Sequence, residues 1–322
     1  MDTGRYTRFP PPLHLQLTSL PFIANNGTGS AKLLVGDIVQ DNACATRTVL
    51  DAGADVNAVL KHAGWNPLWL ACSEGSRRVA VMLIDAGANV HWKDRVARMT
   101  PLHWASRWGL DSVVRALTNG RANVNAANRV GDRPLHEACS SSMDPVVTYL
   151  LNAGAAVNAT NLKGRTAFTV AGENRDCAVM VSLLGAGADA NAFLSDGTTV
   201  LHGYAQVGNV PYVEYLLRAR ANPNAGDSKG RTSLYLACKE RKAAMVDVLI
   251  AAGARLNICD NNGNTPLHVA CRQQDIRLVT TLLQAGANPT VRNNKNQLPA
   301  DRSHNDRRVV KVLKVPVGTP PG

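Results

Sequence analysis

The segment TPLHVACRQQDIRLVTTLLQAGA, residues 265–287, carries the pattern that decides the fold. Its opening Thr265-Pro266 suits the start of a helix, because the threonine hydroxyl can cap backbone N–H groups and proline at the first helical position loses no hydrogen bond. Apolar residues then recur three to four residues apart, as they do on one face of a helix. Gly286 suits a helix end, since glycine accepts the left-handed conformation found there. The segment therefore predicts two short helices.

The same pattern recurs along most of the chain. The closing slot, usually glycine, recurs every 33 or 34 residues, at Gly53, Gly87, Arg121, Gly154, Gly187, Arg220, Gly253 and Gly286. An opening motif lies 21 residues before seven of these slots and begins at Asn66, Thr100, Arg133, Thr166, Thr199, Thr232 and Thr265. Two markers in one register predict a repeat architecture and exclude chance similarity.

The 33-residue period and the Thr265-Pro-Leu-His-Val-Ala270 motif resemble the ankyrin repeat. The resemblance covers about residues 30–315, or about nine units, and implies an all-α, curved ankyrin-repeat solenoid of helix pairs joined by β-turn fingers. The outer units are degenerate, as capping units should be, with Leu298–Asp301 in place of the opening motif. We expect residues 1–29 to form a flexible arm and residues 316–322 a disordered tail.

Composition limits the function further. The chain has 322 residues, a formal net charge of +11 and 45% hydrophobic residues, a balance that argues against disorder. The sequence contains no apolar run long enough to span a membrane and no convincing signal peptide. Its seven cysteines include no C-x-x-C pair, which fits reduced thiols inside a cell. We therefore expect a monomer in the cytoplasm, the nucleus or both.

Catalytic and metal-binding signatures are missing from the sequence. It contains no phosphate-binding loop, no H-E-x-x-H and no G-x-S-x-G. Four histidines occupy one repeat slot in different repeats, at His103, His136, His202 and His268. Equal spacing would place them in separate layers and not in one metal site, and the resemblance implies that they bond backbone groups of neighbouring repeats. We predict no catalytic residue, no metal and no cofactor.

The tryptophans are the first candidate binding feature, because all five lie between residues 65 and 108. Trp65 and Trp92 fall in turn segments, whereas Trp104 and Trp108 flank Arg107 on one predicted helix. Tryptophan and arginine are enriched at the energetic centres of protein interfaces. Trp69 takes the histidine slot, which favours a partly structural role. Two interpretations stay open: an aromatic patch that binds a partner, or rings that fill gaps between repeats.

The second candidate feature is a basic turn edge. Twelve basic residues lie in turn segments, at Lys61, Lys93, Arg95, Arg98, Arg129, Arg133, Lys163, Arg165, Lys229, Arg231, Arg292 and Lys295, against five aspartates. Of these, we include Arg95, Arg98, Arg129 and Lys163 in the predicted site. Such an edge could steer an acidic protein or peptide, or it could be a solvated face. Nucleic acid is the weaker option because no known binding module is present.

Departures from the repeat accompany these features. Residues 57–66 and 91–100 are each one residue longer than later turns, and Arg98 replaces the usual turn glycine. Arg121 and Arg220 stand at glycine slots, where a side chain resists positive φ. We expect Gly120 to relieve the strain at Arg121 by a shift of one residue.

These observations favour a non-catalytic scaffold or adaptor that binds a protein or peptide on its concave face. The alternative is a substrate-recognition subunit of a ubiquitin ligase, like ankyrin proteins with a SOCS box, although nothing after Asp301 resembles such a box. An enzyme is the least favoured class, because about 35 residues outside the repeats are too few for a catalytic domain.

Overall fold

The computed structural model describes residues 35–59, 64–303 and 306–313, so the predicted arm and tail lie outside the described residues. Contacts group the chain into two compact units, which divide between Gly187 and Ala188. The first unit contains α2 (Val35–Val39), α3 (Ala43–Asp51), α4 (Pro67–Glu74), α5 (Arg77–Asp85), α6 (Pro101–Arg107), α7 (Asp111–Asn119), α8 (Pro134–Ser140), α9 (Asp144–Asn152), α10 (Ala167–Asn174) and α11 (Cys177–Gly185). The second contains α12 (Val200–Val207), α13 (Val210–Arg218), α14 (Ser233–Lys239), α15 (Ala243–Ala251), α16 (Pro266–Arg272), α17 (Ile276–Gln284), the 3₁₀ helix η1 (Pro299–Ser303) and α18 (Arg307–Leu313).

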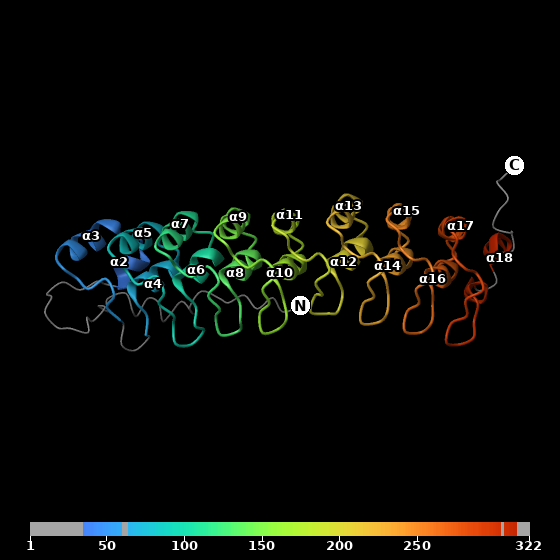
Figure 1. Cartoon of the computed structure of the whole chain (residues 1–322), viewed down its shortest axis with the longest axis horizontal. Coiled ribbons are helices and arrows are strands. Elements are labelled where there is room, and N and C mark those ends of the chain that lie inside the picture. The colour runs from blue at the N-terminus through green and yellow to red at the C-terminus, as the bar shows by residue number, and fades with distance from the viewer. Residues whose placement is uncertain (1–34, 60–63, 304–305, 314–322) are drawn as a thin grey trace. The chain divides into compact units, whose positions relative to one another are not determined.

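Each repeat is a pair of antiparallel helices followed by a finger-like turn. In the first unit the helices α4, α6, α8 and α10 form one row, and α5, α7, α9 and α11 form a second row, which lies above the first in Figure 1. The turns project beyond the first row. Neighbouring repeats pack directly, because α6 contacts both α4 and α8. The all-α repeat fold predicted from the sequence is confirmed.

The two helices of a repeat are buried differently. In α6, Leu102, His103 and Ala105 are fully buried, because this helix is enclosed by its neighbours. The second helices bury one stripe, such as Val113, Val114 and Leu117 of α7. That i, i+1, i+4 spacing follows the helical period, and each buried Leu or Val stabilises the stack by about 1.5–3 kcal/mol.

In four repeats a histidine joins the repeat to the next one. Thr100 caps α6, and its backbone N–H donates to Nδ1 of His103. The Nε2–H of His103 then donates to the Asp132 carbonyl in the following finger, 3.0 Å away. The other three histidines bond in the same way, to the carbonyls of Arg165, Arg231 and Gln297. The predicted structural role of these histidines is confirmed.

The fingers are held by a carboxylate or amide at their base. Asp94 is buried and accepts hydrogen bonds from the backbone N–H groups of Val96, Ala97 and Met99. The same slot in later repeats holds Asn128, Asn161, Asp227, Asp260 and Asn293, each of which accepts finger N–H groups. Leu194 occupies the slot in one repeat, where a bridge between Phe193 and Thr199 forms and Asp196 accepts from Thr198 instead.

The glycine-slot arginines adopt the strained conformation themselves. Arg121 has φ 62° and Arg220 has φ 64°, both in the left-handed region. Gly120 has φ −74°, so the predicted shift of one residue does not occur and this expectation is wrong. Arg98 likewise has φ 56° at the turn-glycine position. The Schellman-type bonds from residue 122 back to Leu117 fix the register, which leaves the positive φ at position 121.

Candidate binding site

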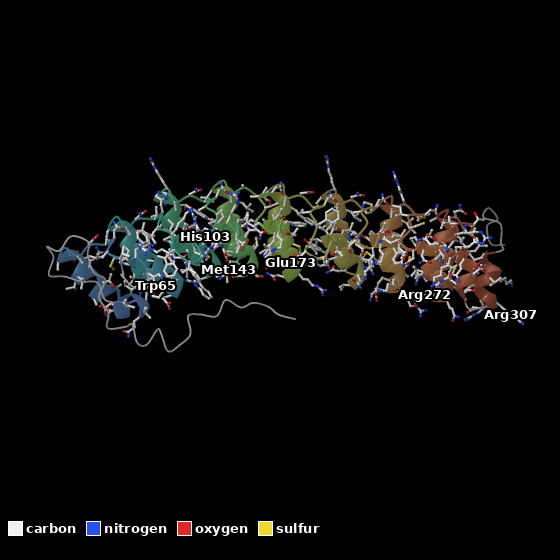
Figure 2. The ribbon with its side chains drawn as sticks, turned by 90° about the horizontal axis from the view of Figure 1, so that it is seen from below. Trp65, His103, Met143, Glu173, Arg272 and Arg307 are labelled. Carbon is white, nitrogen blue, oxygen red and sulfur yellow. The ribbon has the colours of Figure 1, made fainter. Side chains whose placement is uncertain are left out.

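Four of the five tryptophans form a continuous row in the first unit. Trp65 and Trp69 stack with ring centroids 5.6 Å apart and planes 16° from parallel. Trp69 meets Trp104 edge-on at 5.7 Å, and Trp104 stacks on Trp108 at 6.5 Å. Trp65, Trp104 and Trp108 are partly exposed, whereas Trp69 is buried. The row therefore has a buried anchor and three rings that keep accessible apolar surface. Trp65, at the start of the row, is labelled in Figure 2.

The repeat register builds this row. Trp69 lies in α4 at the position where other repeats carry histidine, and its Nε1 donates to the Met99 carbonyl, 3.1 Å away. This replaces the histidine bond to the next finger by an indole bond. Trp108, directly after α6, reaches back to α4, where its Nε1 donates to the Ser73 carbonyl at 2.9 Å. These two indole hydrogen bonds thus link adjacent repeats, while Trp108 stays partly exposed.

A buried carboxylate supports the row from the next repeat. Glu137 of α8 accepts from Nε of Arg107 at 2.9 Å, and the same guanidinium lies 5.7 Å from the centroid of the Trp104 ring. The other carboxylate oxygen accepts from Asn128 at the base of a finger. Burial raises the pKa of Glu137 to about 7, and the positive charge of Arg107 opposes this shift. Glu137 therefore couples the aromatic row to the finger that follows it.

The four basic residues of the predicted edge are all exposed and lie in three consecutive fingers. Arg95 lies beside Gly64, the residue before Trp65, because a Cβ added at Gly64 would lie 3.3 Å from the Arg95 Cδ. Arg129 donates through Nη1 to the Val96 carbonyl of the preceding finger. Arg98 and Lys163 lie in the first and third of these fingers. Of the four, Arg95 is the one that the structure places next to the start of the aromatic row.

Trp92 stands apart from the row. Within the described residues its ring stacks on none of the other tryptophans, and its Nε1 is buried without a hydrogen-bond partner there. Trp104 Nε1 is likewise buried and unpartnered in that part of the chain.

Two members of the site were missed by the sequence interpretation. Trp69 was given a partly structural role and left out of the predicted site, yet it connects the two stacked pairs. Glu137 was not singled out, although a signal existed: it occupies the same repeat slot as Trp104, one period later. Residues in one slot of adjacent repeats are neighbours in a stack, so a charge in a slot that holds Val170 and Val269 elsewhere needs a partner.

Four cysteines of the first helices lie in the protein interior. Cys72, Cys139, Cys238 and Cys271 are buried, and burial raises the pKa of each thiol. Among the described residues, no group of three or more His, Cys, Asp or Glu is arranged to hold a metal ion. No helix in the described ranges has the length and apolarity needed to cross a membrane.

Comparison with known proteins agrees with this geometry. The family model "Ankyrin repeats (3 copies)" matches residues 24–128, 167–260 and 201–293, and the single "Ankyrin repeat" model matches residues 130–162. The crystal structure of the ankyrin repeat domain of Bcl-3, a member of the IkappaB protein family, is 31% identical, with TM-score 0.60, and covers 67% of this chain and 99% of that one. The human ASB11 ankyrin repeat domain is 26% identical, with TM-score 0.54, and covers 70% of this chain and all of that one.

A curated relative, the Neurogenic locus Notch protein of Drosophila melanogaster, is 33% identical over 123 residues. That match covers 37% of this chain and only 4% of the Notch protein's length. Ankyrin repeats are protein–protein interaction domains, and the matches cover most of the chain. The chain belongs to the ankyrin-repeat family.

Proposed function

We propose that this chain is a non-catalytic adaptor that binds a protein partner through the aromatic row and the adjoining basic edge of its first unit. The observation that carries the proposal is the row itself, in which Trp65, Trp104 and Trp108 bury most of their surface yet each keeps a part accessible. Arg107, held over Trp104 by Glu137, adds a rigid cation. Pre-organised tryptophan and arginine side chains are the groups that dominate binding energy at interfaces.

The basic edge defines the expected partner. Arg95, Arg98, Arg129 and Lys163 are exposed and form no ion pair among the described residues, so an acidic surface would meet them without displacing a carboxylate. Opposite charge would speed association and fix orientation more than it would raise affinity. We propose that the adaptor acts as a monomer on the inner, first-helix side of its repeats.

Capture of partners from a cell lysate, with quantitative mass spectrometry of the eluate, tests the proposal. The wild-type chain is compared with the Trp104→Ala/Trp108→Ala variant and with a control, Val207→Ser, that removes an exposed apolar side chain in the second unit. We expect the principal partner to fall at least about tenfold with the double variant, as hot-spot residues imply, and to stay unchanged with the control. Circular dichroism melts establish that each variant folds.

Equal recovery of all partners by the folded double variant would refute the aromatic row as the binding surface. Cullin or elongin components in the eluate would instead favour the ubiquitin-ligase alternative.

A further inference from the structure

Three consecutive fingers of the first unit carry apolar side chains in water. Val96 is 74% exposed, Val130 is 40% exposed and Leu162 is 80% exposed. They lie in the fingers of residues 94–99, 128–132 and 161–165, one in each. Single exposed apolar residues are ordinary, but a contiguous set marks an interaction site.

The three tips are contiguous because the fingers bond to one another. The backbone N–H of Arg129 donates to the Ala97 carbonyl at 2.8 Å, and that of Leu162 donates to the Val130 carbonyl at 3.0 Å. Gly131 permits the second contact, since it has φ 80° and a Cβ there would lie 2.7 Å from the Leu162 nitrogen. The apolar tips therefore form one stripe on hydrogen-bonded backbone and not three separate spots.

The first finger is shaped to expose its tip. Its closing bond runs from the Asp94 N–H to the Met99 carbonyl, whereas the next finger closes from Asn128 to Asp132, one residue shorter. The extra residue lengthens the tip that carries Val96. Arg98 adopts the left-handed conformation in this longer turn, at the position that Gly131 occupies in the next finger. Val96 is exposed in this longer turn, as Val130 and Leu162 are in the shorter ones.

The fully exposed charged side chains of these three fingers are all cations. Arg95, Arg98, Arg129 and Lys163 each lie within two residues of a tip in the sequence. The carboxylates of the same fingers are occupied: Asp94 is buried in its turn, and Asp132 accepts from the Asn161 side chain at 2.7 Å. A cationic rim around an apolar stripe is complementary to a ligand that carries both negative charge and apolar side chains.

We propose that this finger stripe binds an extended acidic segment of a partner protein whose apolar side chains contact Val96, Val130 and Leu162. An extended chain suits the stripe, since the side chains that point to one face of a strand alternate with those that point away. One set would then meet the apolar tips while the acidic set reaches the flanking arginines and lysine. This proposal deepens the proposed function and rests on it, because both use the basic edge.

Selection of a random peptide library of about twelve residues, ~40 Å when extended, on the full chain tests the proposal. The selected peptides are labelled with fluorescein and their binding is measured by anisotropy. We expect them to be acidic and to carry spaced apolar residues. We expect at least about tenfold weaker binding to Val96→Ser/Leu162→Ser and to Arg98→Gly/Lys163→Ser, which remove apolar and cationic contacts at exposed positions. Val207→Ser and Arg218→Ser are the matched controls in the second unit and should bind as the parent does.

Peptides without acidic enrichment, no enriched peptide, or peptides that bind the tip variants as tightly as the parent would each overturn the proposal. Tighter binding of a fluorescein-labelled single-stranded DNA, lost in the same variants, would also overturn it and assign the stripe to nucleic acid. The Trp104→Ala/Trp108→Ala chain separates the two proposals. Peptide binding that survives in this variant supports the stripe even where lysate capture refutes the aromatic row, and the reverse pattern refutes the stripe alone.

Discussion

The Glu137 carboxylate is nearly inaccessible to water and pairs with Arg107 of the preceding repeat, with Oε2 lying 2.9 Å from both Nε and Nη2 of the guanidinium. Removing a charge from water costs several kcal/mol, and this pair offsets that cost only while both members are present. The same arginine lies over Trp104, so the pair connects the buried interior of the stack to the proposed binding surface.

Arg107→Met should therefore destabilise the protein in a pH-dependent way. Burial already raises the folded-state pKa of Glu137 to about 7, above its ordinary 4.5, and loss of Arg107 raises it further. A raised carboxyl pKa means that stability is lost as pH rises through the folded-state value. Urea denaturation should show a loss of about 2 kcal/mol near pH 8 and less than about 1 kcal/mol near pH 5, where the carboxyl is protonated.

Two variants control this experiment. Arg107→Met/Glu137→Gln should recover most of the loss near pH 8, because no uncompensated charge stays buried. Arg218→Met breaks an exposed pair with Glu214, 3.9 Å apart, and should change stability by less than about 0.5 kcal/mol at either pH. A loss for Arg107→Met that is equal at both pH values would contradict the role of the buried carboxylate.

The histidine slot predicts sensitivity to acid. Burial lowers the pKa of all four slot histidines, that of His103 to about 4. A depressed histidine pKa gives stability that is present above the unfolded value near 6.5 and lost as pH falls toward the folded value. Each such histidine contributes a slope of up to about 1.4 kcal/mol of stability per pH unit. Glu137 contributes a slope of the opposite sign, but it is one group against four histidines. The urea midpoint should fall steadily between pH 6.5 and pH 5; a flat profile would refute this assignment.

The glycine-slot arginines store strain that a substitution can release. Arg121→Gly and Arg220→Gly should each stabilise the protein by about 1 kcal/mol, because glycine adopts φ near +60° without a Cβ clash. Arg218→Gly, at the end of α13, should destabilise by a similar amount because its backbone is helical. Thermal melts compare the three variants, and destabilisation by Arg121→Gly would show that the arginine side chain stabilises its repeat.

The close approach of the fingers gives a matched pair of glycine variants. Gly131→Ala places a methyl group against the Leu162 nitrogen, whereas Gly154→Ala meets no atom within 4 Å and incurs only the strain of φ 86°. We expect a loss of about 1 kcal/mol for Gly154→Ala and at least twice that for Gly131→Ala. Equal losses of stability would mean that the two fingers can move apart at Gly131 without destabilising the protein.

Much of the fold could be predicted from the sequence because the same structural signals recur from repeat to repeat. Thr100, His103 and Leu117 recur in equivalent slots, so each helix start, inter-repeat bond and buried stripe is specified several times over. Local propensity and the global fold agree at these positions.

The candidate site could be predicted less completely, because it departs from the repeat. The clustering of Trp65, Trp104 and Trp108 was visible in sequence, but their stacking through Trp69 depends on rotamers that spacing does not specify. Val96 is exposed at the tip of a finger whose backbone N–H groups are held by the Asp94 carboxylate. Composition alone assigns such a valine to the core.

Fluorine NMR of the chain labelled with 5-fluorotryptophan tests the central claim most directly. All five tryptophans lie between residues 65 and 108, so every resonance reports on this region and none comes from the unlabelled partner. Addition of a captured partner should shift the resonances of Trp65, Trp104 and Trp108, assigned by single substitution to phenylalanine, and should move buried Trp69 least. A spectrum that stays unchanged at saturating partner would contradict the aromatic row as the binding surface.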